Sequence, residues 1–332
     1  MTRILVYEPL SAGDPGTTAA LGRDDRARRE MVEAGRSMRD AMAGDLAALE
    51  EMAVTVAVGP QEASLAGLPP HVRAIAPHSG EGAVAFVSRQ APLHDLCWIV
   101  APESAGLLLH LHDAVGDARW IGCDAGAIRV ASSKRATCEA LHAAGIATPL
   151  AFASGDDGPW IVKPDDGAGT QDTRLHATRA AAEADLRRRG EQGNSAIAEP
   201  FVPGEALSLS LVVGPDLARV VAFNRQQVQI DTAGWLHDLG VQAGALVPPD
   251  PRIPALRALA RDVAAAVPGL RGYVGIDVVW NERKGAVVIE VNPRVTCAYA
   301  GLSAALGRNL AADILAAHPR SRWREAAGHG LA

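Results

Sequence analysis

The residues whose types and spacing best suit chemistry lie in two apolar runs near the C-terminal end of the chain. These runs, Gly272 to Trp280 and Ala286 to Val291, are joined by a short polar turn and predict a β-hairpin. A turn centred between them brings Asp277 opposite Ile289 or Glu290. We therefore expect the hairpin to present two carboxylates together.

Asn292 adds an amide to these acids, because side chains two residues apart on a strand share a face. Like charges opposite each other destabilise a sheet, so Asp277 and Glu290 among apolar neighbours require a cation. Carboxylate and amide oxygens on an open face suit a magnesium ion that also binds phosphates. The alternative interpretation is a pair of solvent-facing strand acids.

A second feature is the segment from Glu199 to Glu205, with the sequence EPFVPGE. A backbone carbonyl and a backbone N–H can together read an adenine ring. Pro200 keeps its carbonyl and Val202 has a free N–H, so the proline falls where no donor is required. Glu205 could accept from ribose hydroxyls. The alternative interpretation is a surface loop between two strands.

Lysines supply the positive charge that phosphates require. Lys163 ends the apolar strand that begins at Trp160, and a loop of small and polar residues follows from Pro164 to Thr173. Such a loop brings backbone N–H groups close to phosphate oxygens, and the lysine adds a point charge. Lys134 lies near a predicted helix start, where a solvated lysine is the alternative. The Walker and Rossmann glycine motifs are both absent from the sequence.

Two arginines could bind an anion of the reaction. The guanidinium fork matches the γ-phosphate, an acyl phosphate or a substrate carboxylate. Arg294 comes directly after the predicted hairpin, which favours this role. For Arg225, a structural ion pair is the alternative.

Composition limits the class of protein. The chain has 332 residues, which predicts two or three packed lobes. Its net charge of −6 argues against a nucleic-acid partner. No apolar run approaches the roughly 20 residues that cross a bilayer, and the N-terminus lacks a signal-peptide core, so we expect a cytoplasmic protein without a membrane partner. The scattered cysteines lack zinc-ligand spacing and are expected to be reduced and buried.

The elements that position these residues begin with alternating strands and helices. Strands are predicted at Ile4 to Tyr7, Val54 to Val58 and Leu96 to Ala101, with helical patterns between and after them. This alternation is typical of a parallel sheet covered by helices, in a lobe that ends near Gly122. A further helix is predicted from Asp124 to Ala144, with Ser132 or Ser133 available as a helix cap.

Taken in order, these residues resemble the ATP-grasp superfamily. The matching elements are Ser133-Lys134, Ile161-Val162-Lys163-Pro164 with its loop, Glu199 to Glu205, and Asp277 followed by Ile289 to Arg294. The resemblance implies an α/β fold of the α+β grasp type. It has an N-terminal parallel α/β domain over 1–122, a small ATP-binding lobe with a glycine-rich lid loop over 123–198, and a C-terminal lobe with the metal site over 199–332.

The resemblance also implies roles for individual residues. The implied nucleotide ligands are Lys134, Lys163, Glu199, Phe201, Val202 and Glu205. The implied metal ligands are Asp277, Glu290 and Asn292, which hold two magnesium ions, with manganese as an alternative. Lys163, Arg225 and Arg294 are the implied catalytic residues.

Within the superfamily, three segments resemble the tyramine–glutamate ligase group of methanofuran biosynthesis and its methylotroph relatives: Gly272 to Asp277, Asn292 to Leu302, and Asn224 to Gln226. This resemblance implies an ATP-dependent carboxylate–amine ligase that releases ADP and forms an amide through an acyl phosphate. Its small-molecule substrates would be glutamate and a tyramine-like amine. The alternatives are an amino-acid or peptide ligase of another pathway, or a non-catalytic ATP-binding regulatory protein. A homodimer is one possible oligomeric state.

The amine must lose its proton before it attacks, so its site should contain a base or an apolar wall. The first-lobe loop that begins at Glu8 is the expected place. Glu8 would either contact the amine or cap backbone donors at the end of its strand.

Overall fold

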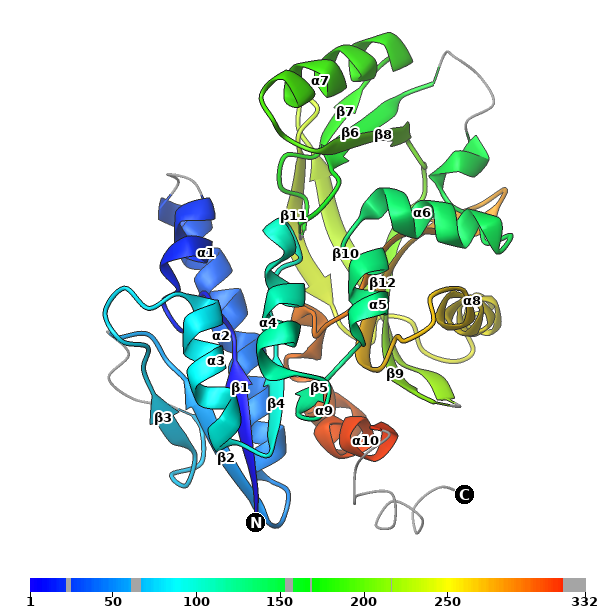
Figure 1. Cartoon of the computed structure of the whole chain (residues 1–332). Helices are drawn as coiled ribbons and strands as arrows, with labels where there is room; N and C mark the ends of the chain where they lie inside the picture. The colour runs from blue at the N-terminus through cyan, green and yellow to red at the C-terminus, as the bar shows by residue number, and fades with distance from the viewer. Residues whose placement is uncertain (22–24, 61–66, 153–157, 168, 216, 319–332) are drawn as a thin grey trace.

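The N-terminal lobe contains a parallel sheet with strand order β3-β2-β1-β4-β5 (Figure 1). A computed structural model describes residues 1–21, 25–60, 67–152, 158–167, 169–215 and 217–318. The strands of this first sheet are β1 (Thr2–Tyr7), β2 (Met52–Ala57), β3 (Arg73–Ile75), β4 (Leu96–Ile99) and β5 (Trp120–Ile121). The predicted parallel α/β lobe is thus confirmed.

Helices cover both faces of this sheet because successive residues of a buried strand point to opposite sides. On one side, Ile4 and Val6 pack with Met42 of the long helix α2 (Asp25–Ala47). On the other, Leu5 and Tyr7 pack with the helices α3 (Ala83–Gln90) and α4 (Leu107–Val115). Short helices lie in the connections, namely α1 (Pro15–Ala20), η1 (Ala91–Leu93) and η2 (Ser104–Gly106).

The helix predicted from Asp124 to Ala144 is in fact two helices, α5 (Ala125–Ala131) and α6 (Lys134–Ala143). Ser133 separates them, because its backbone is extended and its side chain accepts from the N–H of Ala136. The break fixes Lys134 as the first residue of α6. A short helix η3 (Pro149–Phe152) follows.

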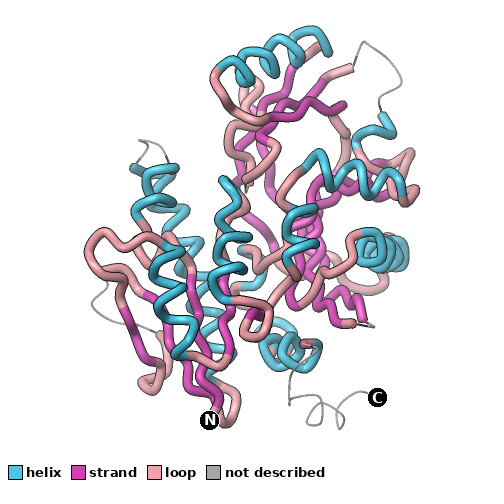
Figure 2. Tube along the Cα trace, viewed as in Figure 1, coloured by secondary structure: helices cyan, strands magenta, loops and turns pink. Residues whose placement is uncertain are grey.

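A small three-stranded antiparallel sheet has the order β7-β6-β8, with bounds β6 (Trp160–Pro164), β7 (Arg174–His176) and β8 (Ala196–Pro200). Helix α7 (Arg179–Glu191) covers it on its outer side, as Figure 2 shows. Thr178 caps this helix.

The C-terminal lobe contains a larger antiparallel sheet with the order β11-β10-β9-β12-β13. Its strands are β9 (Glu205–Gly214), β10 (Leu217–Ile230), β11 (Leu236–Gln242), β12 (Gly272–Asn281) and β13 (Gly285–Asn292). The end of the β10–β11 hairpin reaches the small lobe, where the N–H of Leu236 donates to the carbonyl of Thr173. Both lobes are therefore joined by backbone hydrogen bonds.

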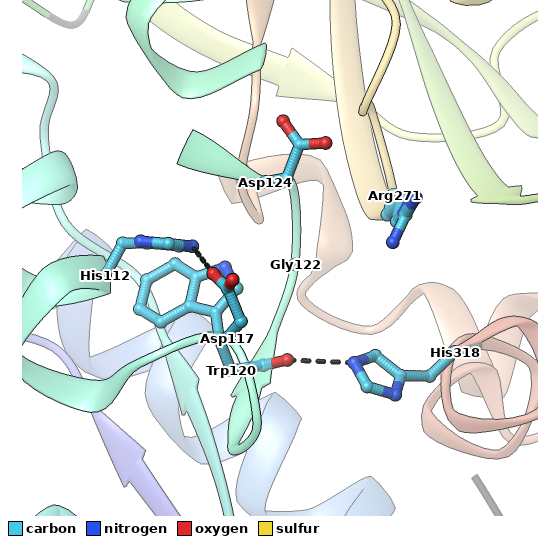
Figure 3. Close-up of a pocket in the computed structure, with 7 residues that line it drawn as sticks. All are labelled: His112, Asp117, Trp120, Gly122, Asp124, Arg271 and His318. Carbon is cyan, nitrogen blue, oxygen red and sulfur yellow. Dashed lines mark hydrogen bonds and ion pairs between the residues drawn. The ribbon is translucent and has the colours of Figure 1, made fainter. Parts of the chain in front are cut away.

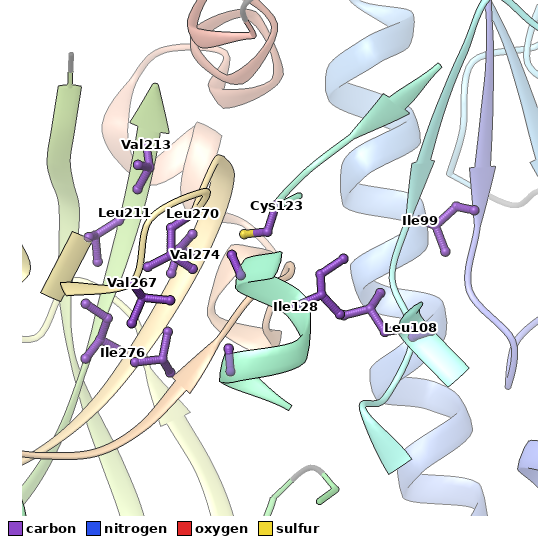
Figure 4. Close-up of a cluster of buried hydrophobic side chains, with 14 of the residues drawn as sticks. Ile99, Leu108, Cys123, Ile128, Leu211, Val213, Val267, Leu270, Val274 and Ile276 are labelled. Atoms are coloured by element: carbon purple, nitrogen blue, oxygen red, sulfur yellow. The ribbon is translucent and has the colours of Figure 1, made fainter. Parts of the chain in front are cut away.

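Alternation along the strands gives this sheet one apolar and one polar face. Ile276 and its neighbour Leu209 belong to one hydrophobic cluster with residues of α8 (Ile253–Ala266). Figure 4 shows Ile276 in this cluster. The adjacent pair Asp277 and Ser208 points to the opposite face. The polar face therefore carries the candidate site.

The chain then returns to the N-terminal lobe through η4 (Cys297–Tyr299), α9 (Leu302–Leu306) and α10 (Leu310–Ala317). Asp45 of α2 accepts hydrogen bonds from the hydroxyls of Tyr299 and Ser303, at 2.6 and 2.5 Å. Among the helices of the described residues, none combines the length and apolar character that a bilayer span requires.

The prediction for the cysteines is wrong for one of them and incomplete for another. Cys97 and Cys123 are buried, Cys138 is half-buried and Cys297 is exposed, and all four are free thiols. Cys297 is the first residue of η4, which follows the last strand of the C-terminal sheet.

Candidate active site

The hairpin formed by β12 and β13 has the register that its sequence predicts. Asp277 pairs with Glu290, and Asn292 pairs with Gly275. An irregularity in the pairing follows Asp277, between it and Val278. Two carboxylates and one amide thus lie together on the polar face of the sheet.

Asp277 is held by amide groups from two other strands. Its Oδ1 accepts from Nε2 of Gln226 at 3.0 Å, and its Oδ2 accepts from Nδ2 of Asn292 at 3.2 Å. Burial and the nearby carboxylate of Glu290 raise the pKa of Asp277 to about 7. Two acids this close favour a cation between them.

Lys134 supplies one positive charge next to Glu290. Its Nζ lies 3.2 Å from Oε1 of Glu290 and donates to the carbonyl of Gly167 at 3.0 Å. Asp165 fixes the start of the helix, because its side chain accepts from Ser133 Oγ and from the N–H of Arg135. The loop after β6 and the first turn of α6 are therefore tied together at the acids.

Lys163 lies at the end of β6 and pairs with a neighbouring strand. Its Nζ is 2.6 Å from Oε1 of Glu199 on β8, and both side chains are buried. The pairing of Ile161 with Glu199 in the small sheet sets this contact. A predicted phosphate ligand and a predicted nucleotide ligand are therefore in direct contact.

The segment between β8 and β9 keeps one backbone donor available. The N–H of Phe201 donates to the carbonyl of Pro159, whereas that of Val202 has no hydrogen-bond partner among the described residues. Gly204 lies so close to the carbonyl of Trp280 that a Cβ would be 2.2 Å from the oxygen. This contact sets the path of the segment and requires glycine at that position.

Glu205 is held by two arginines. Its Oε1 accepts from Nε of Arg225 at 2.6 Å, and its Oε2 accepts from Arg252. Burial would raise the pKa of Glu205, but the two guanidinium groups lower it below its ordinary value. The structural ion pair considered for Arg225 is thus present.

Arg294 follows the hairpin and contacts the N-terminal lobe. Its guanidinium donates to both oxygens of Glu103, which lies just after β4. Burial works to lower the pKa of Arg294, yet the carboxylate of Glu103 raises it above its ordinary value.

The loop after β6 lies across this region and contacts the N-terminal lobe. The N–H of Ala105 donates to Oδ2 of Asp166 at 2.8 Å, and Oγ1 of Thr170 accepts from the N–H of Asp238 on β11. Ala168, in the middle of the loop, lies outside the described residues. The described residues of this loop therefore contact both the N-terminal lobe and β11.

Glu8, considered for the amine, caps its own loop. Its carboxylate oxygens accept from the N–H groups of Leu10 and Ser11, at 3.1 and 2.7 Å, and only 3% of the residue is exposed. Burial raises its pKa. Both oxygens are engaged, which favours the capping interpretation.

Three residues at the site were missing from the predicted set, namely Glu103, Asp165 and Gln226. Gln226 could have been found from alternation, since it shares a face of β10 with Asn224, whose side chain bonds Ser208 and Ser210. Nothing local in the sequence marks Glu103, whose partner is far along the chain.

The side chains present fit a magnesium site completed by phosphates. Among the described residues, no group of three or more His, Cys, Asp or Glu side chains is arranged to hold a metal. Magnesium, however, commonly takes only one or two carboxylates and completes its shell with phosphates and water. Asp277, Glu290 and the amide oxygen of Asn292 provide such a set, and burial together with the charge of Glu290 raises the pKa of Asp277.

A separate cavity of about 210 Å³ lies at the junction of the lobes (Figure 3). Its lining residues are His112, Asp117, Trp120, Gly122, Asp124, Arg271 and His318. None of the predicted site residues lines it. The imidazole of His112 contacts Asp117 at 3.2 Å, and His318 bonds the carbonyl of Trp120.

Two family models match the chain. The ATP-grasp domain matches residues 131–298, and the pre ATP-grasp 3 domain matches residues 52–128. The first match contains both lysines and the hairpin acids.

Two curated proteins with similar sequences are ligases. A tyramine–L-glutamate ligase of Methanocaldococcus jannaschii is 28% identical over 212 residues, or 63% of this chain and 58% of that protein. Its counterpart in Methanocaldococcus fervens is 27% identical over 210 residues, or 63% of this chain and 61% of that protein. The matched stretch thus spans less than two thirds of either relative.

Solved structures share the fold at low sequence identity. An ATP-grasp superfamily protein from Archaeoglobus fulgidus superposes with a TM-score of 0.66 at 21% identity, covering 97% of this chain and 90% of that one. An L-amino acid ligase from Bacillus licheniformis gives a TM-score of 0.60 at 16% identity, covering 95% of this chain and 73% of that one.

Proposed function

Because the chain belongs to the ATP-grasp family, we propose that it is an ATP-dependent carboxylate–amine ligase. The observation that carries this proposal is the meeting of opposite charges at the hairpin. Lys134 lies 3.2 Å from Glu290, which is paired with Asp277. A triphosphate with magnesium would be bound by both the lysine and the acids.

In the proposed arrangement, residues 123–198 form the small ATP-binding lobe and 199–332 the lobe with the metal site, after an N-terminal domain over 1–122. Lys134 and Lys163 hold phosphate oxygens. The adenine is bound by Glu199, Phe201 and Val202. In this segment the backbone N–H of Val202 is the available donor. Glu205 accepts from the ribose once Arg225 or Arg252 yields one of its bonds.

Asp277, Glu290 and Asn292 would hold magnesium, or manganese in its place. The metal, when bound, supplies positive charge that stabilises the transferring phosphoryl group. Arg294 follows β13, two residues after Asn292, and binds an anionic oxygen of the acid or phosphate.

The proposed reaction has two steps. A substrate carboxylate oxygen attacks the γ-phosphorus, and ADP leaves with the electron pair of the broken P–O bond. The nitrogen of the amine then attacks the acyl carbon, a C–N bond forms, and inorganic phosphate leaves. One proton of the original ammonium goes to solvent before attack and the second leaves as the amide forms. Lys163, held near the phosphates, stabilises their negative charge.

We infer glutamate and a tyramine-like primary amine as substrates, in a methanofuran-type biosynthetic step. The support is the name of the two curated relatives, tyramine–L-glutamate ligase. The product would be a γ-glutamyl amide.

The test is to incubate the protein with ATP, magnesium and panels of acids and amines, and to measure ADP, phosphate and product mass. We expect ADP and phosphate only when both an acid and an amine are present. The Glu290→Gln variant serves as the inactive control. AMP and pyrophosphate as products would overturn the proposal, because they indicate adenylation. Activity with another acid but not with glutamate would retain the ligase class and reject the substrate assignment.

A further inference from the structure

The β10–β11 hairpin forms a wall beside the hairpin acids, and its alternation shows which side chains face them. Gln226 of β10 donates to Asp277, so its face of the strand is the one turned to the acids. The register irregularity between Gln226 and Val228 adds a residue to β11 and not to β10. Alternation along β10 therefore places Val228 and Ile230 on that same side.

Asp238 of β11 lies directly opposite Val228 in the pairing of the two strands. Cross-strand partners project to the same face of a sheet, so Asp238 also faces the acids. Its backbone N–H donates to Oγ1 of Thr170 at 3.1 Å, which places it beneath the loop after β6. Asp238 thus lies next to this loop at Thr170.

The carboxylate of Asp238 has no cation partner. Its Oδ1 accepts from the N–H of Gly240 at 2.8 Å, and no Lys, Arg or His of the described residues forms an ion pair with it. The residue is exposed, and its neighbour Val228 is 40% exposed. An unpaired carboxylate and an exposed apolar side chain therefore lie next to each other at the site.

A third metal ligand is one explanation for such an acid, but the geometry disfavours it. Among the described residues, Asp238 does not join Asp277 and Glu290 in any group of three that could hold a metal. Its pairing with Val228 and its backbone hydrogen bond to Thr170 nevertheless place it beside the acids. An acid near the reacting groups but outside metal-binding distance suits an organic cation.

We propose that Asp238 and Val228 bind the amine substrate, with the carboxylate accepting from its ammonium group and the valine packing against its carbon body. This inference rests on the proposed ligase function. A primary alkylamine is protonated until about pH 10, so it arrives as a cation. Charge-assisted hydrogen bonds to a carboxylate are among the stronger polar contacts available to it.

The experiment compares two nucleophiles in the full-length protein with ATP, magnesium and glutamate. Tyramine carries a positive charge at neutral pH, whereas hydroxylamine is uncharged and traps an acyl phosphate as a hydroxamate. For Asp238→Asn we expect the KM for tyramine to rise roughly tenfold to a hundredfold, from the loss of one hydrogen bond to a charged group. Hydroxamate formation and the KM for ATP should stay at the wild-type value.

Three further variants make the comparison specific. Asp238→Glu should restore part of the affinity for tyramine. Asp262→Asn, an exposed acid on α8 away from this wall, should match the wild type with both nucleophiles. Val228→Ser should weaken the binding of tyramine more than that of methylamine. Melting temperatures of all variants are compared with the wild type, so that a folding defect is recognised.

Three outcomes would overturn the inference. In the first, Asp238→Asn leaves the KM for tyramine unchanged. In the second, it reduces hydroxamate and amide formation by the same factor, which would indicate a role shared by all nucleophiles. In the third, the wild type releases no ADP with any combination of acid and nucleophile, hydroxylamine included, which would overturn the proposed function and this inference with it.

Discussion

The carboxylate of Glu103 accepts two hydrogen bonds from the guanidinium group of Arg294, at 2.9 and 3.0 Å. The side chains of Arg294 and Glu103 are 9% and 3% exposed. Glu103 belongs to the N-terminal lobe and Arg294 follows the hairpin that carries the acids, so one buried ion pair joins the lobes beside the proposed site. Removing one partner of such a pair leaves an uncompensated buried charge.

We expect Glu103→Gln to lower the free energy of unfolding by about 3 kcal/mol, because the buried guanidinium loses its charged partner. The double variant Glu103→Leu with Arg294→Met should recover most of this stability, since two apolar side chains of similar size fill the same space. The double variant should lack ligase activity, because it lacks Arg294. Urea denaturation and product assays measure the two effects. A loss below about 1 kcal/mol would show that the pair behaves like a surface ion pair.

The pH dependence of stability follows from Asp277. Its pKa of about 7 lies above its ordinary value of 3.8, so the folded metal-free protein holds a proton that the unfolded chain releases. The contribution of this group to the free energy of unfolding is therefore full below about pH 4 and is lost as the pH rises to about 7. Unfolding in EDTA between pH 4 and 8 should show this fall in the wild type relative to Asp277→Asn. Equal slopes for the two proteins would contradict the assignment.

Glu290→Gln should separate activity from folding. Turnover should fall at least about a hundredfold, because one carboxylate of the proposed metal site is gone. The melting temperature in EDTA should change little, because relief of the repulsion with Asp277 offsets the loss of the ion pair between Glu290 and Lys134. Calorimetry with magnesium and ATP checks the loss of binding. Wild-type turnover with a lowered melting temperature would show that Glu290 is structural.

Lys163→Met should weaken nucleotide binding. We expect the dissociation constant for ATP to rise roughly tenfold to a hundredfold, because one charge-assisted contact to phosphate is lost. The substitution also leaves Glu199 without its partner at 2.6 Å, so stability should fall. Lys284→Met, in the turn of the hairpin, is the matched control with unchanged ATP affinity. Titration with a fluorescent nucleotide analogue measures the affinity of both variants. An affinity of Lys163→Met equal to that of Lys284→Met would exclude a phosphate contact by Lys163.

The sequence alone determined the hairpin and the acids that it presents. The two apolar runs and the polar turn between them place Asp277 opposite Glu290, because strand alternation and a short turn leave little freedom in the register. The same local rules predict β1, β2 and β4 of the N-terminal sheet, but not β3 or β5, and a serine cap at Ser132 or Ser133 for α6. These features depend only on residues that are close along the chain.

Only the tertiary structure decided which distant groups meet the acids. Glu103 and Arg294 are 191 positions apart, and Gln226 and Asp277 are 51 positions apart, so no local pattern links them. The exposure of Cys297 and the position of Asp238 likewise follow from how the lobes pack and from a change of register between β10 and β11. The physical reason is that a short segment fixes the direction of its own side chains, whereas the partners they meet depend on contacts between elements that the whole fold brings together.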